Sequence, residues 1–526
     1  MKQTVDINSI PKEKFTLVQE NQRLTDQKFE DKPIGYFKDA WIRFCKNKGS
    51  IVAAIIILII ILFSLLAPLF ITSHSSTFMD VNYAKKPSRD LTLSKIGISQ
   101  GTTSRDFAEA GLLRDVAIGV GAEDRDGSGG ISIAEGLQSY YQPIKYIGEA
   151  TTYSEIKGAK PKTIFSGCTV ENYLEVGFVY KSIEQSEYAR IVAWQEETGI
   201  QVLYPLVANN SYNMDSSDAN YWYKSKKGIA VTTASGKDKT VNFSEDLVLE
   251  DNYKRDSSGN PLFFEYTGGG THETAQYKVR MLYYNYYRYL NGAEPEYIFG
   301  TDSQGYDLAL RLAGGIRLSL LLAVCVSAIN LTIGAIYGAI EGYYGGAVDL
   351  ILERISDILY GVPFIVVATL FQLHLAKKVG PVPSLLFAFV LTGWLGTAYR
   401  TRTQFYRFKG QEYVLAARTL GAKDRRIIWK HIFPNSLGTI ITSSVLVIPG
   451  VISSESMLSY LGIVKLGDAT TTSLGTLLSD AAPIWTNYPH LLLYPALVLS
   501  LLMICFNLFG NGLRDAFNPS LRGVEE

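Results

Sequence analysis

The amino-acid sequence predicts a polytopic α-helical membrane protein with six transmembrane helices and an extracellular mixed α and β domain inserted between helices 1 and 2. The first observation is an uncharged apolar run from Ile51 to Ile71, whose 21 residues reach the length of about 20 that a helix needs to cross a bilayer. The second is a series of further apolar stretches in the C-terminal half. The third is the polar, aromatic-rich region between them, which is long enough to fold as a domain.

The first apolar run is expected to be retained as a membrane helix. A cleavable signal peptide would be shorter, would lie nearer the N-terminus and would end in a small-residue cleavage site, whereas about 50 residues precede this run. The predicted layout therefore begins with a cytoplasmic segment, residues 1–49, and continues with transmembrane helix 1, residues 50–72.

The other predicted spans lie in a second membrane region, residues 299–515, which is followed by a short cytoplasmic tail, residues 516–526. Pro363 and Pro449 are expected to kink the helices that contain them. The five apolar stretches of this region are Leu318–Ile340, Ile358–Leu373, Ser384–Ala398, Leu437–Ser453 and Leu491–Leu508.

Lys and Arg in short loops set the orientation of a membrane protein, because loops rich in them stay in the cytoplasm. Residues 32–48 carry five basic side chains and one acidic side chain, and residues 400–430 carry nine basic and two acidic ones. Both regions are therefore predicted to be cytoplasmic, as are both termini of a six-span chain in the plasma membrane. The inserted domain, residues 73–298, is then extracellular.

Composition and motifs exclude several classes of function. The 50 basic and 50 acidic residues balance, so neither nucleic acid nor an acidic substrate is suggested. No Gly-x-x-x-x-Gly-Lys-Ser/Thr loop occurs, so the chain is not expected to hold ATP itself, and we predict a non-catalytic protein. Of the four cysteines, only Cys168 lies on the predicted outer side, where we expect it to be buried rather than reactive.

The inserted domain shows both strand and helix patterns. A turn signal precedes a strand-like run at residues 262–267. Helical periodicity appears in Ser104–Gly119 and in Glu273–Leu290, the second ending at a stop signal that contains Gly292. The tyrosine-rich run Met281–Tyr289 is a candidate surface for holding peptide, although such a stripe more often packs in a core.

Residues 124–135 resemble a twelve-residue calcium-binding loop of the EF-hand type, position by position. Carboxylates begin and end the loop, and a glycine at its sixth position allows the sharp bend. The resemblance is limited to these twelve residues, and a solvated acidic turn is the alternative. Calcium here would stabilise the fold, because extracellular sites of this kind bind weakly. The predicted metal ligands are Asp124, Asp126, Ser128, Gly130 through its carbonyl, Ser132 through water, and Glu135.

A basic, helix-prone segment, residues 412–435, lies between two predicted spans and is the most informative part of the sequence. Ala416, Ala417 and Gly421 leave part of it almost without side chains, so another protein could approach its backbone closely. We expect a helix that breaks at Gly421 and resumes with an apolar stripe against the spans, while Ala416 and Ala417 face outward. The alternative is an ordinary basic loop that only sets topology.

Residues 299–522 resemble the permease subunits of binding-protein-dependent ABC importers, specifically the dipeptide and oligopeptide branch. The resemblance rests on four motifs: residues 299–307 (FGTDSQGYD), 354–363 (RISDILYGVP), the 412–435 segment and 507–519 (NLFGNGLRDAFNP). It implies a permease fold and identifies the 412–435 segment with the family's EAA loop, whose coupling helix sits in a groove of an ATPase subunit. The residues assigned to ATPase coupling are Glu412, Tyr413, Ala416, Ala417, Arg418, Gly421 and Ala422.

The sequence departs from the family pattern at three positions. Leu415 stands where the leading Glu of the EAA loop is usual, with Glu412 one turn earlier. Tyr306 stands where the family has Arg, so any function of that Arg outside the membrane could be altered. His431 replaces a more general Ile, and we expect it to pack or to contact the helix dipole.

Polar side chains inside the predicted spans are candidates for lining a transport pathway, because such groups usually face the bundle interior or a wet cavity. Hydrogen bonding between helices explains any one of them equally well. No charged residue is expected in the middle of a span, which favours a peptide over an ion as cargo. The candidates are Asn330, Gln372, Ser443, Ser444 and Asn507.

The resemblance implies a permease subunit of an ATP-driven peptide importer that pairs with a second, homologous permease in the lipid bilayer. Two ABC ATPase subunits would hydrolyse the ATP, and an extracellular peptide-binding lipoprotein would deliver the peptide. The inserted domain could dock that lipoprotein, cap the passage or hold peptide. An importer of nickel or another small solute is the nearest alternative, and a membrane-anchored receptor or adhesion protein is the alternative of another class.

Overall fold

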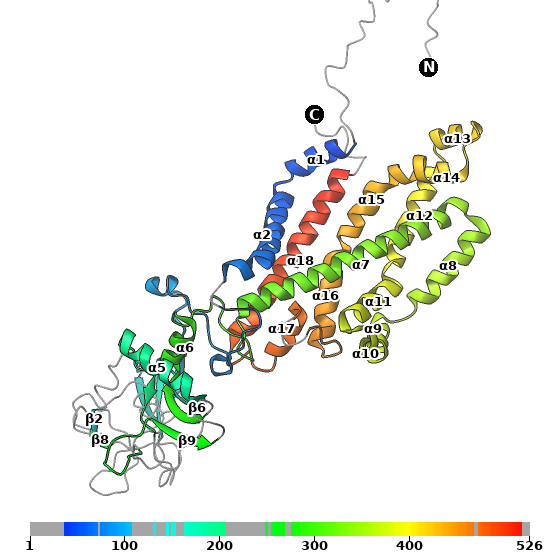
Figure 1. Cartoon of the computed structure of the whole chain (residues 1–526). Coiled ribbons are helices and arrows are strands. Elements are labelled where there is room, and N and C mark those ends of the chain that lie inside the picture. Colours follow the sequence, from blue (N-terminus) through cyan, green and yellow to red (C-terminus); the bar gives the residue numbers. More distant parts are fainter. Residues whose placement is uncertain are drawn as a thin grey trace, which may run out of the picture.

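The structure is a computed structural model in which long helices form a bundle and a domain of sheets and short helices lies at one end of it (Figure 1). We call this end of the bundle the insert side and the other end the opposite side. The described residues are 36–71, 74–107, 130–132, 144–146, 149–153, 162–206, 248–250, 254–268, 275–467 and 472–517.

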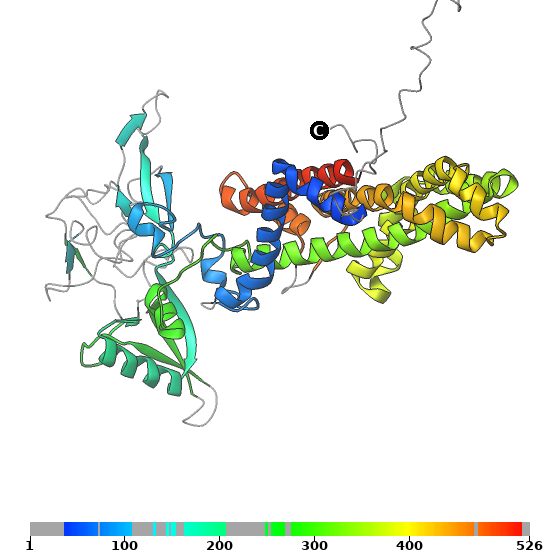
Figure 2. The same cartoon turned by 90° about the horizontal axis from the view of Figure 1, so that it is seen from above.

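Two helices from the start of the chain pack against the last one (Figures 1 and 2). They are α1 (Tyr36–Lys46) and α2 (Lys48–Phe70), and the last helix is α18 (Pro489–Phe517). The Ser50 hydroxyl of α2 donates to the carbonyl of Leu508 in α18 at 3.1 Å. A Cβ atom at Gly512 would lie 1.9 Å from that hydroxyl oxygen, so the helices approach this closely only because position 512 is glycine.

Among the described residues, five helices are long and apolar enough to cross a membrane, or six if the bent pair α8 and α9 counts as one span. All six predicted apolar stretches fall on these helices. The remaining helices are α7 (Leu308–Tyr344), α8 (Gly346–Tyr360), α9 (Phe364–His374), α10 (Ala376–Val379), α11 (Pro381–Gly393), α12 (Leu395–Lys409), α13 (Glu412–Thr419), α14 (Asp424–Arg426), the π-helical segment η5 (Ile427–Ile432), α15 (Phe433–Val445), α16 (Val447–Tyr460) and α17 (Leu474–Ala481).

Both prolines that were expected to kink helices lie beside irregularities. The bent pair α8 and α9 turns by 72° at a break that contains Pro363. The helix that runs through α15 and α16 is interrupted at Leu446, three residues before Pro449. A proline ring removes a backbone donor and crowds the preceding turn, which accounts for both positions.

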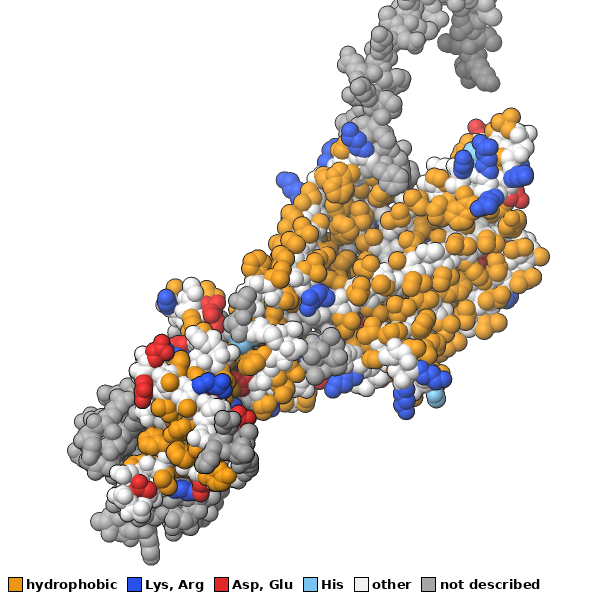
Figure 3. All heavy atoms as spheres, viewed as in Figure 1, with side chains coloured by type: hydrophobic (Ala, Val, Ile, Leu, Met, Phe, Trp, Pro, Cys, Tyr) orange, Lys and Arg blue, Asp and Glu red, His pale blue; other side chains and the backbone are white. Residues whose placement is uncertain are grey.

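Hydrophobic side chains cover most of the face of the bundle seen in Figure 3, and most of the Lys and Arg side chains on this face lie towards its two ends. On α2 alone, Leu58, Ile59 and Leu69 are each more than half exposed. Soluble proteins rarely expose apolar surface on this scale, and a lipid environment explains it. The chain is therefore a multi-pass membrane protein.

The inserted domain is mixed α and β, as the sequence predicts. Its described part holds antiparallel sheets with the order β1-β5-β3, with β4 also on β5, and β6-β10-β7, with β9 also on β10, together with the pair β2-β8. The elements are β1 (Thr102–Phe107), β2 (Gly130–Ser132), β3 (Ile144–Tyr146), β4 (Glu149–Tyr153), β5 (Lys162–Glu171), β6 (Phe178–Glu184), β7 (Leu203–Tyr204), β8 (Val248–Glu250), β9 (Phe264–Gly268), β10 (Gln276–Leu282), α5 (Gln185–Thr198), α6 (Tyr283–Asn291) and the 3-10 turns η3 (Val81–Tyr83) and η4 (Leu93–Ile96).

Two predicted helices of this domain are wrong in part. The stretch Ser104–Gly119 begins inside strand β1, which pairs with β5, and residues 108–119 lie outside the described part. The stretch Glu273–Leu290 divides into strand β10 and helix α6, and α6 ends before Gly292 as predicted. Pairing of β10 with the distant strands β6 and β7 overrides the local helical pattern. The predicted strand at residues 262–267 is confirmed by β9.

The tyrosine-rich run forms part of the core of the inserted domain. Tyr283, Tyr284 and Tyr287 are each 5% exposed or less and cluster with Tyr83 and Tyr173. The run is therefore core packing, and its candidacy as a peptide-holding surface is not supported. The Cys168 side chain is fully buried in β5, as expected for a structural cysteine.

Residues 299–307 join the inserted domain to α7 through backbone hydrogen bonds. Asp302 accepts at one carboxylate oxygen from three successive amides, those of residues 304–306, each at 2.9 Å. The Gly305 carbonyl accepts from the Asp80 amide at 3.0 Å, and the Asp302 carbonyl accepts from the Lys85 amide at 2.8 Å. The chain leaving α2 and the chain entering α7 are thus bound together at this joint.

Charged side chains complete the joint. Asp307 caps the start of α7 by accepting from the amides of Ala309 and Leu310, and its other oxygen lies 3.4 Å from the His74 ring. Arg311, one turn into α7, lies 3.2 Å from the Asp302 carboxylate and covers the Tyr306 ring. The motif at residues 299–307 has Tyr306 in place of the family's Arg, and Arg311 of α7 lies beside this tyrosine.

Replacement of Gly305 by Ala should weaken this joint. Gly305 has φ +97°, and an added Cβ would lie 1.9 Å from the Asp80 carbonyl oxygen. We expect a loss of about 3–5 kcal/mol from backbone strain and overlap together, measured by thermal unfolding of the purified protein.

Gly268→Ala is the matched control, because Gly268 has φ +98° but no described atom within 4 Å of an added Cβ. It should cost only the strain, about 1–2 kcal/mol. Equal losses in the two variants would contradict a tight joint at Gly305.

Candidate functional site

The 412–435 segment folds as a helical hairpin on the opposite side of the bundle (Figure 1). Helix α13 ends at Thr419, and the amide of Ala422 donates back to the carbonyl of Ala417 at 3.0 Å. Gly421 adopts φ +80°, a left-handed conformation that glycine accepts without strain. The predicted break at Gly421 is therefore present, and the chain resumes in α14 and η5.

The inner face of this hairpin is anchored in a small apolar core. Val414, Ile427 and Ile432 are fully buried, and they cluster with Phe405 of α12 and Tyr343 of α7. This is the apolar stripe that the sequence predicts. Burying each of these aliphatic side chains contributes about 1.5–3 kcal/mol, so the hairpin is held to the end of the bundle.

A polar contact reinforces this core. The Tyr343 hydroxyl donates to the Asp424 carboxylate at 2.5 Å and accepts from the Arg418 guanidinium at 3.4 Å. The last turn of α7 is therefore bonded to both arms of the hairpin.

The outer face of the hairpin carries little side chain. Ala416 is exposed and Ala417 half-buried, and the neighbouring Arg418 is exposed. Leu420 at the tip is 88% exposed. An apolar tip of this kind, next to small residues and charge, suits a contact with another protein. Of the other assigned residues, Glu412 is exposed, the Tyr413 hydroxyl accepts from Asn435, and Ala422 packs against the apolar core.

An arginine cluster that sequence analysis missed holds α12 beside the preceding helices. Arg402 contacts Asp349 through two hydrogen bonds of 2.6 and 2.8 Å, Glu353 at 3.0 Å and Glu341 at 3.5 Å. The acids belong to α7 and α8, and Arg402 belongs to the basic loop that was counted only for topology. Asp349 and Glu353 are four residues apart, so they lie on the same face of a helix. This spacing is the sequence signal that could have indicated a shared basic partner.

A buried carboxylate in α16 is the second feature that was missed, because the predicted span ended at Ser453. Glu455 is fully buried, and its oxygens accept from the hydroxyls of Ser319 at 3.1 Å, Ser459 at 3.0 Å and Ser473 at 2.7 Å. Three segments, α7, α16 and the start of α17, are thereby joined on the insert side. The contact is structural, since all the donors are protein hydroxyls.

The pathway candidates separate into different environments. Asn330 is buried, and an added Cβ at Gly393 would lie 2.3 Å from its amide nitrogen, so it packs between α7 and α11. The Ser444 carbonyl accepts from Ser327 of α7 at 2.8 Å, an interhelical contact. Gln372 donates to the Pro381 carbonyl at 2.9 Å, and Asn507 donates to its own helix at 2.8 Å.

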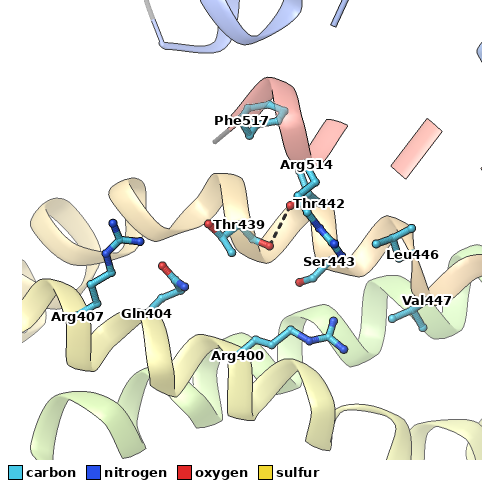
Figure 4. A pocket seen from close by; sticks show the side chains of 10 residues that line it. All are labelled: Arg400, Gln404, Arg407, Thr439, Thr442, Ser443, Leu446, Val447, Arg514 and Phe517. Atoms are coloured by element: carbon cyan, nitrogen blue, oxygen red, sulfur yellow. Dashed lines mark hydrogen bonds between the residues drawn. The ribbon is translucent and has the colours of Figure 1, made fainter. Parts of the chain in front are cut away.

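Ser443 alone among these candidates lines a cleft, which has a volume of about 580 Å³ (Figure 4). The cleft lies between α12, α15 and α18, and the structure does not bring the other four candidates to it. Its walls also carry Arg400, Arg407 and Arg514. A polar opening bounded by three helices exists in the bundle, but the sequence located only one of its residues.

The predicted calcium loop lies almost wholly outside the described residues. Only Gly130–Ser132 is described, as strand β2 paired with Val248–Glu250. Within the described part of the chain, no group of three or more His, Cys, Asp or Glu side chains is placed to hold a metal ion. The calcium ligands remain a prediction from spacing.

Comparison with known proteins gives two family matches. Residues 330–523 match the family described as binding-protein-dependent transport system inner membrane component. Residues 35–87 match the family described as the N-terminal transmembrane domain of oligopeptide transport permease C. The matched range 35–87 ends within the first residues of the inserted domain, and the matched range 330–523 begins after this domain.

Two sequence relatives, OppC and DppC of Bacillus subtilis, agree with these matches. The chain is 41% identical over 236 residues to the oligopeptide transport system permease protein OppC of Bacillus subtilis, covering 44% of this chain and 76% of the relative. It is 41% identical over 226 residues to the dipeptide transport system permease protein DppC of the same organism, covering 43% and 69%. A chain of the inward-facing MetNI methionine ABC transporter is 15% identical, with a TM-score of 0.34, over 40% of this chain and 96% of that one.

Removal of one hydroxyl should loosen the 412–435 segment. In Tyr343→Phe the Asp424 carboxylate loses its 2.5 Å donor while the apolar core stays intact. We expect local opening to become more favourable by about 1 kcal/mol, which corresponds to roughly fivefold faster hydrogen–deuterium exchange of residues 412–426.

Tyr344→Phe provides the control, because this neighbouring ring is 54% exposed and its hydroxyl makes no hydrogen bond to any described residue. Unchanged exchange in Tyr343→Phe, or an equal change in Tyr344→Phe, would refute the anchoring role.

Proposed function

We propose that this chain, which belongs to the family of binding-protein-dependent transport system inner membrane components, is the membrane-spanning permease subunit of an ATP-driven oligopeptide or dipeptide importer. Its relatives are permease subunits of ABC transporters, which are not themselves catalytic. ATP hydrolysis is assigned to two partner ATPase subunits, and a second, homologous permease completes the passage. An extracellular lipoprotein would deliver the peptide.

The observation that carries this proposal is the surface of the 412–435 segment. Its outer face presents Ala416 and Ala417, and its inner face is buried in the core formed with α7 and α12. A partner that moves this surface also moves Val414 and the Tyr343–Asp424 contact. Movement of an ATPase is in this way transmitted to the membrane helices, which would open alternately to the two sides.

The same assignment orients the protein. The segment lies on the opposite side of the bundle from the inserted domain (Figure 1), so a cytoplasmic segment requires an extracellular insert. The basic residues around the segment support the cytoplasmic assignment. Both termini are then cytoplasmic as well, in a six-span chain in which the bent pair α8 and α9 counts as one span.

Peptide is the favoured cargo, because both curated relatives named above are peptide permeases. Nickel or another small solute is the competing cargo, and an uptake assay with peptides of different lengths against nickel separates the two. A receptor or adhesion function is disfavoured by the permease matches over residues 330–523. Copurification with an ATPase tests that point directly.

The inserted domain has a proposed role in docking the peptide-binding lipoprotein or capping the passage. Its location supports this role, since it is bound tightly to the start of α7 through Asp302 and Gly305. Deletion of residues 80–290 should reduce uptake delivered by the lipoprotein while the helices still assemble. Full uptake by the deleted protein would remove the proposal.

Enlarging the small outer face should uncouple ATP hydrolysis from transport. In Ala417→Phe or Gly421→Phe the bulky ring should keep the ATPase surface away, and Gly421→Phe also strains a left-handed backbone. We expect peptide uptake by the reconstituted importer to fall at least about tenfold, with membrane insertion unchanged and ATP hydrolysis no longer dependent on peptide.

Ala376→Phe is the matched control, a half-buried alanine in α10 on the insert side. It should leave uptake within about twofold of normal. Normal uptake in both Ala417→Phe and Gly421→Phe would overturn the coupling assignment.

We also propose that residues 124–135 bind calcium, a proposal supported by the ligand spacing of the sequence alone. If the Kd is about 1 mM, 10 mM calcium should stabilise the full-length protein by about 1.4 kcal/mol relative to chelator, seen as a rise of a few degrees in Tm. Asp124→Asn together with Glu135→Gln should abolish the rise. The same Tm with calcium and with chelator in the unsubstituted protein would end this proposal.

A further inference from the structure

The cleft between α12, α15 and α18 is lined by positive charge (Figure 4). Arg400 and Arg407 lie seven residues apart on α12, on one helix face, and Arg514 projects from α18. All three are exposed, and no acidic residue lines the cleft in the described part of the chain. Three guanidinium groups on one cleft create a positive potential that an anionic ligand would neutralise.

The contrast with Arg402 on the same helix shows that this arrangement is specific. Arg402 points away from the cleft and is bound by Asp349 and Glu353. Within the described residues, neither Arg400 nor Arg407 has an acid within ion-pair distance, and the Arg407 guanidinium lies 5.6 Å from the centre of the neighbouring Phe408 ring. Helix α12 therefore carries one arginine that is satisfied inside the protein and two that face an open cleft.

Two hydroxyl groups of the cleft have their protons committed to backbone carbonyls. The Thr442 hydroxyl donates to the carbonyl of Thr439 at 3.1 Å, and the Ser443 hydroxyl donates to the carbonyl of Ile440 at 2.8 Å. With these protons committed, the hydroxyl oxygens offer lone pairs to a ligand. Gln404, between the two arginines on α12, offers both a donor and an acceptor.

We propose that this cleft binds the C-terminal end of a peptide, with its carboxylate on the arginines and its last amide N–H groups on the hydroxyl oxygens. The proposal rests on the proposed peptide-importer function and assigns a cargo site within it. Guanidinium forks match carboxylates geometrically, and a volume of about 580 Å³ is in the range of small-ligand sites. A phosphodiester headgroup would also satisfy the arginines, but it lacks the amide N–H groups that the acceptors require.

The position of the cleft links cargo to coupling. Helix α12 ends at Lys409, directly before the 412–435 segment, and α15 begins at Phe433 within its last residues. A ligand that bridges Arg400 and Ser443 therefore fixes the spacing of the two helices that carry this segment. The cleft lies toward the opposite side of the bundle, where peptide would arrive after crossing the membrane.

The test uses the intact importer, with its ATPases, in phosphatidylcholine nanodiscs without the external lipoprotein. The probe is N-terminally dansylated tetraalanine, and its binding is followed by fluorescence anisotropy. Arg400→Gln and Arg514→Gln should each weaken binding roughly tenfold or more, because each removes a charged hydrogen-bond donor. The C-terminal amide of the same probe should bind the unsubstituted importer with a similar loss.

Combining the Arg400→Gln substitution with the amidated probe tests whether Arg400 itself binds the carboxylate. Amidation should have little further effect in Arg400→Gln, since its partner is already missing. Arg354→Gln is the control, an exposed arginine of α8 that pairs with Asp357 and does not line the cleft, and it should bind normally. The affinity of Arg400→Lys for the acid probe should lie between those of the unsubstituted importer and Arg400→Gln. Such partial binding would show that the site is still folded.

Three results would overturn the proposal. One is equal binding of the acid and amide probes, a second is displacement of the probe by phosphatidylglycerol in the nanodiscs, and the third is loss of the ATPases from the purified Arg→Gln variants. Uptake of tetraalanine by the unsubstituted importer with its lipoprotein is measured in parallel. Peptide uptake without amide sensitivity removes only the cleft assignment, whereas absence of any peptide uptake removes the proposed function itself.

Discussion

A polar side chain within a membrane bundle must find its partner inside the protein, because lipid tails offer none. This constraint determines which helices of the chain are held together. Glu455 is satisfied by hydroxyls from α7 and from the start of α17, and Ser327 of α7 donates to the Ser444 carbonyl of α15. The bonds from Ser319 and Ser327 join residues 136 and 117 positions apart, and the bond from Ser473 joins residues 18 positions apart. Satisfying the polar groups therefore also fixes the arrangement of the spans.

The two ends of the bundle obey the same constraint in different ways. On the insert side, the Asp302 carboxylate collects successive amides of a tight turn, and Arg311 balances its charge. On the opposite side, Arg402 gathers acids from α7 and α8. The cleft arginines are the exception, since none of them has an acid within ion-pair distance among the described residues. This difference is the reason for treating the cleft as a site and the other clusters as structure.

Sequence patterns predicted the membrane helices and the hairpin well, because both depend on local composition. The apolar stretches, the break at Gly421 and the burial of Ile427 and Ile432 after it all follow from neighbouring residues. The inserted domain was harder, since strand β1 and strand β10 owe their conformation to partners far along the chain.

The candidate site was predictable to a similar extent. The sequence places polar residues such as Asn330 and Ser444 inside spans, but it does not show which side of the helix faces a neighbour. A residue packed between helices could therefore not be distinguished from one that lines a cleft. In the sequence, Arg400 counted only towards topology and Arg514 was only part of the 507–519 motif. Their meeting at one cleft depends on how α12, α15 and α18 fold together.

Helix α7 is a single long helix that connects the two ends of the bundle. It is capped by Asp307 at the joint with the inserted domain, and its last residues hold Asp424 through Tyr343 (Figure 2). Its 37 residues make a rod about 55 Å long, so a tilt of about 5° displaces one tip by about 5 Å relative to the other. The inserted domain is bonded to the first turn of this rod, so we expect a tilt of the rod to move the inserted domain with it.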